Sequence, residues 1–293
     1  MGVITLENKF LRVEINPDEG ASVVAFSVCR AAGWLELLPD TEPSFLMVPY
    51  SNRIENGSFV FEGRSYQLAN AEQHALHGVV LSRSWTVKQV SSSQVCCEFS
   101  SASSAAVNWP WPFEVQVEYH LLANALASRL VLWNRGQSAM PAGMGWHPYY
   151  NRALSRPGEL VQLCMKVQRA YPDANGNRIP SGPAEPLTAA QDFSAGKPLA
   201  PEHFLDTCFQ GYDGQGYIAW PESGLKLNYQ CTRECTHLVV YNPRLPYFAV
   251  EPVTNANNGV NLYSQGEPQS GIVSLAPGSS LEAGFVQQVE VLN

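Results

Sequence analysis

The sequence predicts an all-β protein, built as a large antiparallel β-sandwich with few and short helices. Apolar and polar side chains alternate in several segments, as in half-buried strands, and other segments are short continuous apolar runs. The chain of 293 residues also contains 22 glycines and 21 prolines, which separate these segments as turns separate short strands. We expect one domain over residues 1–293, because no stretch has the composition of a linker.

The expected strands are distributed along the whole chain. The clearest are, in order, 11–16, 114–121, 225–230, 237–241 and 247–250. The first three alternate between apolar and polar residues, which predicts one buried and one exposed face. The last two are continuously apolar, which predicts strands covered on both faces and therefore a second layer. The best helical signals, Leu187 to Phe193 and Pro201 to Leu205, are too short to cover a sheet.

Composition and charge narrow the function. The formal net charge of −8 and the pI near 5.3 oppose binding to nucleic acid. No apolar segment approaches the roughly 18 residues needed to cross a bilayer, so we expect no membrane partner. The start, Met1 to Leu6, lacks the basic and apolar regions of a secretion signal. The sequence therefore predicts a cytoplasmic protein that acts on a small molecule.

Seven cysteines are scattered over the chain, an odd number without the spacing of a disulfide framework. We expect them to be reduced thiols. Cys231 and Cys235 have the spacing of half a zinc site, but no second Cys/His pair at ligand spacing follows them. We therefore expect no metal site. We expect no other cofactor either, because one carboxylate and one imidazole suffice for the acid–base chemistry that other residues of the chain indicate.

Five segments each place an ionisable side chain among turn-forming or aromatic residues. They are 52–57 with Arg53, 74–78 with His77, 145–150 with His147, 205–209 with Asp206 and 251–255 with Glu251. The set contains a candidate acid, a candidate base and several groups that bind neutral hydroxyls. Such an inventory is typical of an enzyme that performs acid–base chemistry on sugars.

Glu251 and His147 carry the predicted chemistry. A cyclic hemiacetal opens when a base removes the C1 hydroxyl proton while an acid protonates the ring oxygen, and reclosure after rotation yields the other anomer. Glu251 follows an apolar run and precedes Pro252, so we expect it at a strand end, where it is the base. His147 is flanked by Trp146 and Tyr149, which offer ring faces to a pyranose, and we expect it to be the acid.

The other three residues are expected to hold the sugar. Arg53 supplies a fixed fork of donors, and His77 can donate or accept a hydrogen bond. Asp206 can accept two hydroxyl protons. A non-catalytic carbohydrate-binding protein would need no paired acid and base, so the presence of both Glu251 and His147 favours an enzyme. A glycosidase relative would instead place two carboxylates, here Asp206 and Glu251, on either side of the bond.

The chain resembles the aldose 1-epimerase family, also called galactose mutarotases, over nearly its whole length. The matching motifs are Asn52-Arg53-Ile54 followed by Gly57 and Phe59, Leu76-His77-Gly78 followed by Trp85, and Glu251-Pro252-Val253-Thr254-Asn255. The resemblance implies that His147 is the family's acid, Glu251 its base and Asp206 its substrate-binding aspartate. It further implies a galactose mutarotase-like β-supersandwich with the site on a concave face.

Departures from the galactose-specific pattern concern the choice of sugar. Trp146 stands where those enzymes have Asn, and Pro252-Val253 stands where they often have Thr-Gln. In the related hexose-6-phosphate mutarotases, the His-Gly segment runs on to an Arg that helps to hold the phosphate. Leu81 occupies this position here, and the next arginine is Arg83. The sequence leaves open the preferred aldose, the acceptance of sugar phosphates and the oligomeric state.

Overall fold

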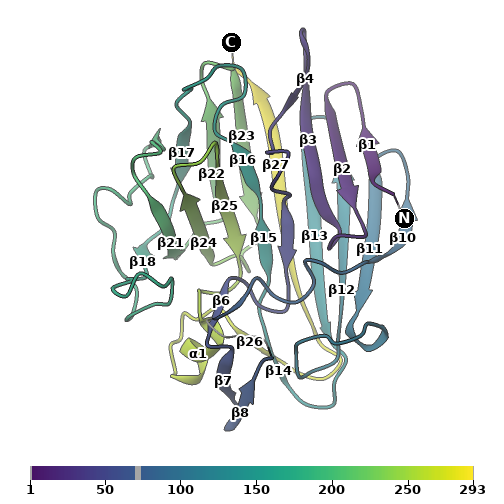
Figure 1. The fold of residues 1–293 in the computed structure, drawn as a ribbon, viewed down its shortest axis with the longest axis vertical. Helices are drawn as coiled ribbons and strands as arrows, with labels where there is room; N and C mark the ends of the chain where they lie inside the picture. Colours follow the sequence, from purple (N-terminus) through teal and green to yellow (C-terminus); the bar gives the residue numbers. More distant parts are fainter. Residues whose placement is uncertain (1, 70–73, 293) are drawn as a thin grey trace.

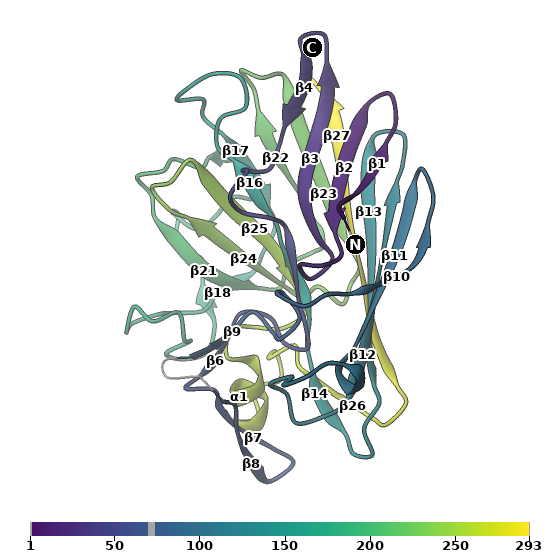
Figure 2. The same ribbon diagram turned by 45° about the vertical axis from the view of Figure 1, so that its right-hand side comes forward.

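The computed structural model describes residues 2–69 and 74–292, whose regular secondary structure consists almost entirely of antiparallel strands (Figure 1). A nine-stranded sheet forms one layer. A four-stranded and an eight-stranded sheet lie on the same side of it, and three two-stranded ribbons complete the described sheets (Figure 2). The predicted fold class, an all-β antiparallel sandwich with few short helices, is confirmed.

The nine-stranded sheet is the continuous layer of the sandwich. Its order is β10 (Thr86–Val90), β11 (Gln94–Ser100), β12 (Phe113–Leu121), β13 (Ala125–Asn134), β27 (Ser280–Val291), β23 (Leu225–Cys231), β22 (Gln215–Trp220), β17 (Gln162–Met165) and β20 (Lys197–Pro198). The predicted alternation gives β12 a strictly alternating pattern of buried and half-buried side chains. Its inner face therefore contributes a full row to the core.

The eight-stranded sheet carries most of the candidate site residues. Its order is β19 (Glu185–Pro186), β18 (Arg169–Ala170), β21 (Leu205–Gln210), β24 (His237–Asn242), β25 (Tyr247–Val253), β15 (Gly145–His147) and β5 (Phe45–Met47), with β16 (Tyr149–Asn151) also paired to β25. Strands β24 and β25 are buried on both faces, as their continuous apolar runs predict.

The remaining strands extend and close the second layer. They are β1 (Ile4–Glu7), β2 (Leu11–Asn16), β3 (Ser22–Arg30) and β4 (Gly33–Glu36) in the four-stranded sheet, and the ribbons β6 (Arg53–Glu55) with β9 (His74–Leu76), β7 (Ser58–Phe61) with β8 (Arg64–Gln67), and β14 (Met140–Ala142) with β26 (Val273–Leu275). The Tyr119 hydroxyl of β12 donates to the Ala21 carbonyl at 2.9 Å. This bond ties the four-stranded sheet to the nine-stranded one.

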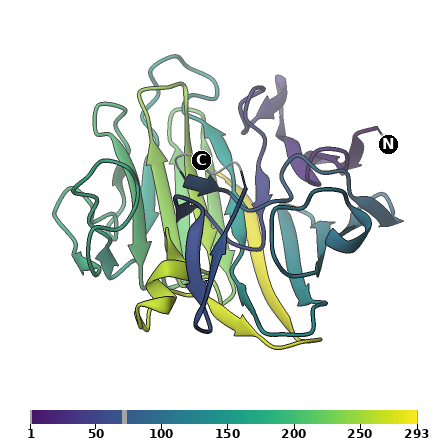
Figure 3. The ribbon, with the colours of Figure 1, turned by 60° about the horizontal axis from the view of Figure 1, so that its bottom comes forward.

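The helices lie elsewhere than expected. The segment 187–193 forms only a turn, in which Gln191 N–H donates to the Thr188 carbonyl at 3.0 Å. One turn is too short to propagate as a helix. Leu205 begins β21, because it pairs with Asn242 across the sheet. The helices of the described chain are η1 (Ser101–Ser103) and α1 (Gly259–Ser264), which packs beside β7 (Figure 3).

The two faces of the eight-stranded sheet have different surroundings. One face packs on the nine-stranded sheet, where the Tyr150 hydroxyl donates to Gln287 at 2.8 Å. The other face has a floor of small and apolar buried side chains, namely Phe45, Met47, Cys208, Val239 and Val253. The odd-numbered residues of β25 point to this second face, and Glu251 is among them. The candidate site therefore has an apolar base.

The described residues contain no disulfide, no metal-binding cluster and no membrane-spanning helix. All seven cysteines are free thiols. Within residues 2–69 and 74–292, no three His, Cys, Asp or Glu side chains cluster in a way that would hold a metal ion. No helix in those ranges has the length and apolar character needed to span a bilayer.

Candidate active site

His147 and Glu251 face each other across neighbouring strands. The cross-strand pairs on either side of them are Gly145 with Val253 and Tyr149 with Ala249. Both pairs have the same register, so His147 falls opposite Glu251 with its side chain on the same face. The His147 Nε2 atom lies 3.2 Å from Glu251 Oε1.

Two prolines interrupt the strand ladder around this pair. Thr254 N–H donates to the Met144 carbonyl at 2.8 Å. Because N–H directions alternate along antiparallel strands, the even-numbered residues here direct their backbone N–H toward the opposite strand. Pro148 and Pro252 occupy such positions and have no N–H to donate. The pairing of β25 therefore stops at β15 and resumes at β16.

The position of Glu251 within its strand differs from the expectation. We expected a strand end, because Pro252 follows Glu251, but β25 continues to Val253. The reason is that Pro252 lacks a donor only on the side of the interruption. On the other side β25 remains paired with β24 through Pro252 and Val253. Glu251 is thus held in the interior of a strand, which limits its freedom to move.

Burial shifts the pKa values of both His147 and Glu251. Their side chains are 4% and 2% exposed. Burial lowers the pKa of His147 well below its usual range, and His77 and Arg53 act in the same direction. Burial raises the pKa of Glu251 well above its usual range, with Asp206 adding to the shift and Arg53 opposing it. Because an extra charge is disfavoured in either direction, the pair holds one proton over a wide pH range.

Aromatic rings surround the His147 imidazole on the site face. Phe45 stacks on it with centroids 4.5 Å apart and planes 21° apart. The His77 ring approaches edge-on at 4.9 Å, and the Tyr149 ring lies at 4.5 Å. These contacts fix the ring plane and leave its Nε2 directed at Glu251. Sequence analysis missed Phe45, because the β5–β15 pairing that places it here joins segments far apart in the chain.

Trp146 does not share this face, contrary to expectation. Neighbouring residues of a strand point to opposite sides of the sheet. Trp146 is 2% exposed and packs on Phe285 of β27 with ring centroids 5.6 Å apart. Tyr149 remains the aromatic neighbour available to a ligand. Trp146 is therefore part of the hydrophobic core between the two layers.

The β6–β9 ribbon brings Arg53 and His77 to the site. His77 N–H donates to the Asn52 carbonyl at 2.7 Å. His77 and Gly78 both have left-handed backbone angles, with φ of 60° and 73°. A Cβ on Gly78 would collide with the backbone of Val48, so glycine is required there. Burial and the Arg53 charge lower the pKa of His77 to about 3, which keeps its imidazole neutral.

The segment after β25 anchors the Arg53 strand. Asn255 Oδ1 accepts a hydrogen bond from the Ser51 backbone at 3.2 Å. Asn258 N–H donates to the Arg53 carbonyl at 2.8 Å, and its Oδ1 accepts from Glu55 N–H at 3.0 Å. The asparagines of this segment thus connect the Asn-Arg-Ile motif to the Glu251 motif. Two motifs about 200 residues apart in sequence (Ser51 to Asn255) become one structural unit.

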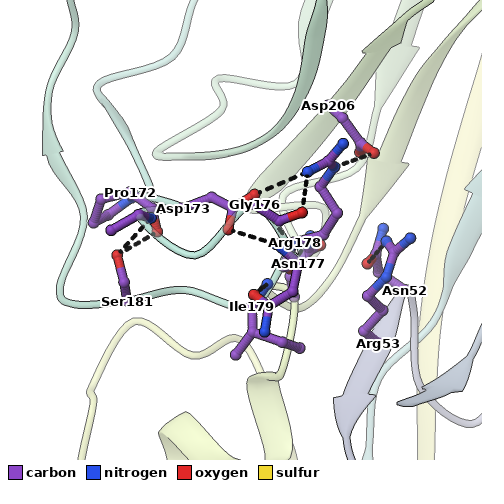
Figure 4. A network of polar contacts seen from close by, with 12 residues as sticks. Asn52, Arg53, Pro172, Asp173, Gly176, Asn177, Arg178, Ile179, Ser181 and Asp206 are labelled. Atoms are coloured by element: carbon purple, nitrogen blue, oxygen red, sulfur yellow. Dashed lines mark hydrogen bonds and ion pairs between the residues drawn. The ribbon is translucent and has the colours of Figure 1, made fainter. Parts of the chain in front are cut away.

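Asp206 reaches the same face from β21 and is ion-paired. Arg178 Nε lies 2.6 Å from Asp206 Oδ2, and Arg178 Nη1 lies 3.2 Å from Asp173 Oδ2 (Figure 4). Sequence analysis missed Arg178. It lies in a turn-rich segment, 172–183, that matches no motif, and nothing in its local sequence marks it as functional. Asp206 therefore has one oxygen engaged, whereas we expected both to be available for sugar hydroxyls.

Several buried polar atoms at this site lack partners. Among residues 2–69 and 74–292, no hydrogen bond is made by His147 Nδ1, Glu251 Oε2 or Asn257 Oδ1. Buried polar atoms are usually satisfied. In the same described ranges, buried atoms of Trp85, Trp109, Trp146, Tyr212 and His237 also make no hydrogen bond, so unpaired atoms are not confined to this site. The structure thus brings all five predicted residues to one region and adds Phe45, Arg178 and Asn257 to it.

Comparisons with known proteins identify the family of this chain. The family model for aldose 1-epimerase matches residues 2–288. YphB of Escherichia coli K12, an uncharacterized protein, is 26% identical over 314 residues, covering 100% of both chains. A galactose mutarotase-like protein from Lactobacillus casei ATCC 334 has a TM-score of 0.82 at 17% identity, covering 99% of this chain and 100% of that one. The GalM/aldose epimerase homologue from C. elegans has a TM-score of 0.82 at 18% identity, covering 100% and 99%. The chain belongs to the aldose 1-epimerase family.

Proposed function

We propose that this protein is a mutarotase that interconverts the α and β anomers of free aldoses. The observation that carries the proposal is the contact of 3.2 Å between His147 Nε2 and Glu251 Oε1. An imidazole and a carboxylate at this separation can exchange protons with two oxygens of one sugar ring. The family membership of the chain supports the same reaction.

The reaction moves one proton in and one proton out of the pair. Glu251 accepts the C1 hydroxyl proton while the bond between C1 and the ring oxygen breaks. His147 donates its proton to the ring oxygen, which leaves an open-chain aldehyde. After rotation about the C1–C2 bond, the protons return in reverse and the ring closes as the other anomer. The pair begins and ends each cycle with one proton.

The burial of the pair suits this cycle. The proton can lie on Glu251 or on His147 without changing the net charge of the pair. Arg53 favours the Glu251 carboxylate, because its charge lowers the Glu251 pKa. Arg53 also lowers the pKa of His147, so it makes a protonated His147 the stronger acid while it stabilises the carboxylate form of Glu251. We assign sugar binding to Arg53, His77 and Asp206, whose hydrogen-bonding groups surround the pair.

Polarimetry tests the proposed function. Freshly dissolved α-D-glucose, α-D-galactose and a pentose should each reach rotational equilibrium faster with protein than without it. The enzyme-dependent rate should increase linearly with protein concentration. A protein that binds these sugars and leaves the rate at its spontaneous value would be a carbohydrate-binding protein instead.

Neutral aldoses should have a higher kcat/KM than their 6-phosphates. A sugar phosphate needs two or more cations that are free to meet its charge. Arg83 donates to the carbonyls of Ala105 and Ala106 at 2.8 and 2.9 Å, away from the site. Arg178 is already paired with two carboxylates. Within the described ranges, Arg53 donates instead to the neutral side chain of Asn52, at 3.1 Å, so among these three it is the cation left to meet a charged ligand.

Glucose and glucose 6-phosphate should be compared in the same assay at low ionic strength. A preference of about tenfold or more for the phosphate, worth roughly 1.4 kcal/mol, would contradict the neutral-sugar interpretation.

A further inference from the structure

We infer that Arg178 is a sugar-binding residue that acts together with Asp206 to recognise two neighbouring hydroxyl groups. The inference rests on the proposed function, because it takes an aldose as the ligand. It adds a specificity-determining residue that none of the five sequence motifs contains. The inference is based on the hydrogen-bond donor and acceptor that the ion pair between Arg178 and Asp206 leaves unused.

The ion pair presents a free donor beside a free acceptor. Arg178 uses Nε for Asp206 Oδ2 at 2.6 Å and Nη1 for Asp173 Oδ2 and the Gly176 carbonyl, at 3.2 and 2.7 Å. Within residues 2–69 and 74–292, Arg178 Nη2 and Asp206 Oδ1 make no hydrogen bond. One sugar hydroxyl can donate to Oδ1 while its neighbour accepts from Nη2. This pattern matches a vicinal diol.

The backbone of Arg178 is built to hold this position. Its φ is 68°, a left-handed angle that is unfavourable for a residue with a side chain. The Asp173 carboxylate accepts the backbone N–H groups of Asn177 and Arg178 at 3.0 and 3.1 Å. Asn257 Nδ2 donates to the Arg178 carbonyl at 3.2 Å. Strained residues that several contacts enforce are concentrated at functional sites.

The Arg178–Asp206 ion pair is separated from His147 and Glu251 by about the width of a sugar ring. Asp206 of β21 is opposite Tyr241 of β24, which is opposite Ala249 of β25, two residues from Glu251. Two strand spacings of about 4.8 Å separate β21 from β25. A pyranose ring with a hydrogen bond on each side fits such a span. Asp206 also raises the pKa of Glu251 through its charge, which places the two carboxylates on one site.

The charges around Arg178 favour an uncharged ligand group. Asp206 and Asp173 both pair with the guanidinium, so its positive charge is already balanced. A phosphate would need cations that are not already paired, whereas a hydroxyl group needs only a donor or an acceptor. The pair is therefore suited to hydroxyls.

The test compares Arg178→Met with Arg129→Met. Arg129 is also paired with two glutamates, Glu118 and Glu282, but it lies on the nine-stranded sheet. The ligands are D-glucose and its 2-, 3- and 4-deoxy analogues, with Kd from calorimetry and kcat/KM from polarimetry. Wild-type protein should bind the analogues that lack either recognised hydroxyl about tenfold more weakly than glucose. Those two analogues should be deoxygenated at adjacent carbons.

Arg178→Met should bind glucose about tenfold more weakly and should no longer discriminate against one of those two analogues. Arg129→Met should retain the wild-type pattern. Melting temperatures identify a variant that fails to fold, in which case Arg178→Lys, which keeps the charge but not the planar fork, carries the test. Wild-type discrimination among the analogues by either folded Arg178 variant would overturn the inference. Absence of sugar binding by the wild-type protein would overturn it as well.

The same measurements separate this inference from the proposed function. If the wild-type protein binds glucose with the expected pattern, Arg178→Met loses that pattern, and mutarotation stays at the spontaneous rate, the mutarotase proposal fails and the role of Arg178 stands. If mutarotation is accelerated and the pattern is unaffected by Arg178→Met, the role of Arg178 fails alone.

Discussion

Glu251→Gln and His147→Asn should each lower the enzyme-dependent mutarotation rate by about two to four orders of magnitude. Gln cannot accept the C1 hydroxyl proton, and Asn cannot deliver a proton to the ring oxygen. Each substitution is close in size to the native side chain, so the fold should persist. Polarimetry with α-D-glucose or α-D-galactose measures the rate, and circular dichroism checks the fold.

A buried histidine outside the pair provides a matched control. His237 lies on the neighbouring strand β24, is 1% exposed and contacts Thr236 Oγ1 at 2.9 Å through Nδ1. His237→Asn should retain most of the activity, because the side-chain hydrogen bond and ring contact of His237 within residues 2–69 and 74–292 are with Thr236 and Tyr171. Rates near the wild-type value in both Glu251→Gln and His147→Asn would refute the assignment of acid and base.

Arg53→Met should lower the rate about ten- to a hundredfold and move the whole pH profile to higher pH. The active pair holds one proton, so the acidic limb marks uptake of a second proton and the basic limb marks loss of the last one. Arg53 lowers the pKa of both His147 and Glu251. Removing the Arg53 charge therefore raises both pKa values, and the acidic and basic limbs of the pH profile both move to higher pH. The loss of a sugar donor accounts for the lower rate.

Asp206→Asn should shift the pH profile in the opposite direction and serves as the comparison. Asp206 raises the pKa of Glu251, so its neutralisation should move the basic limb to lower pH. Rates are measured by polarimetry at constant ionic strength, with the spontaneous rate subtracted at each pH. Limbs that stay in place in Arg53→Met, or that move to lower pH, would show that another group controls the protonation of the pair.

The strands of this fold can be predicted from local patterns, but their partners cannot. The alternation in 114–121 and the continuous run 247–250 each give the right element and the right burial. The pairing of β5 with β15 joins residues about 100 positions apart (Phe45 with His147). No local pattern encodes such a contact. The stacking of Phe45 on His147 therefore became visible only in the structure.

The errors at the site have two physical origins. Trp146 could have been assigned correctly, because strand alternation directs adjacent residues to opposite faces. Arg178 could not, since its role depends on Asp206, which lies beyond a turn-rich segment of the chain. The sequence motifs thus pointed to five residues that the structure brings to one region. They did not point to Arg178, which pairs with one of those five, Asp206.

Pro148 and Pro252 remove two backbone donors from the ladder between the strands that carry His147 and Glu251. Because proline has no N–H, no rearrangement of the backbone can restore those two hydrogen bonds. Between the positions where β25 pairs with β15 and with β16, the contact of 3.2 Å between His147 Nε2 and Glu251 Oε1 therefore joins the strands through side chains.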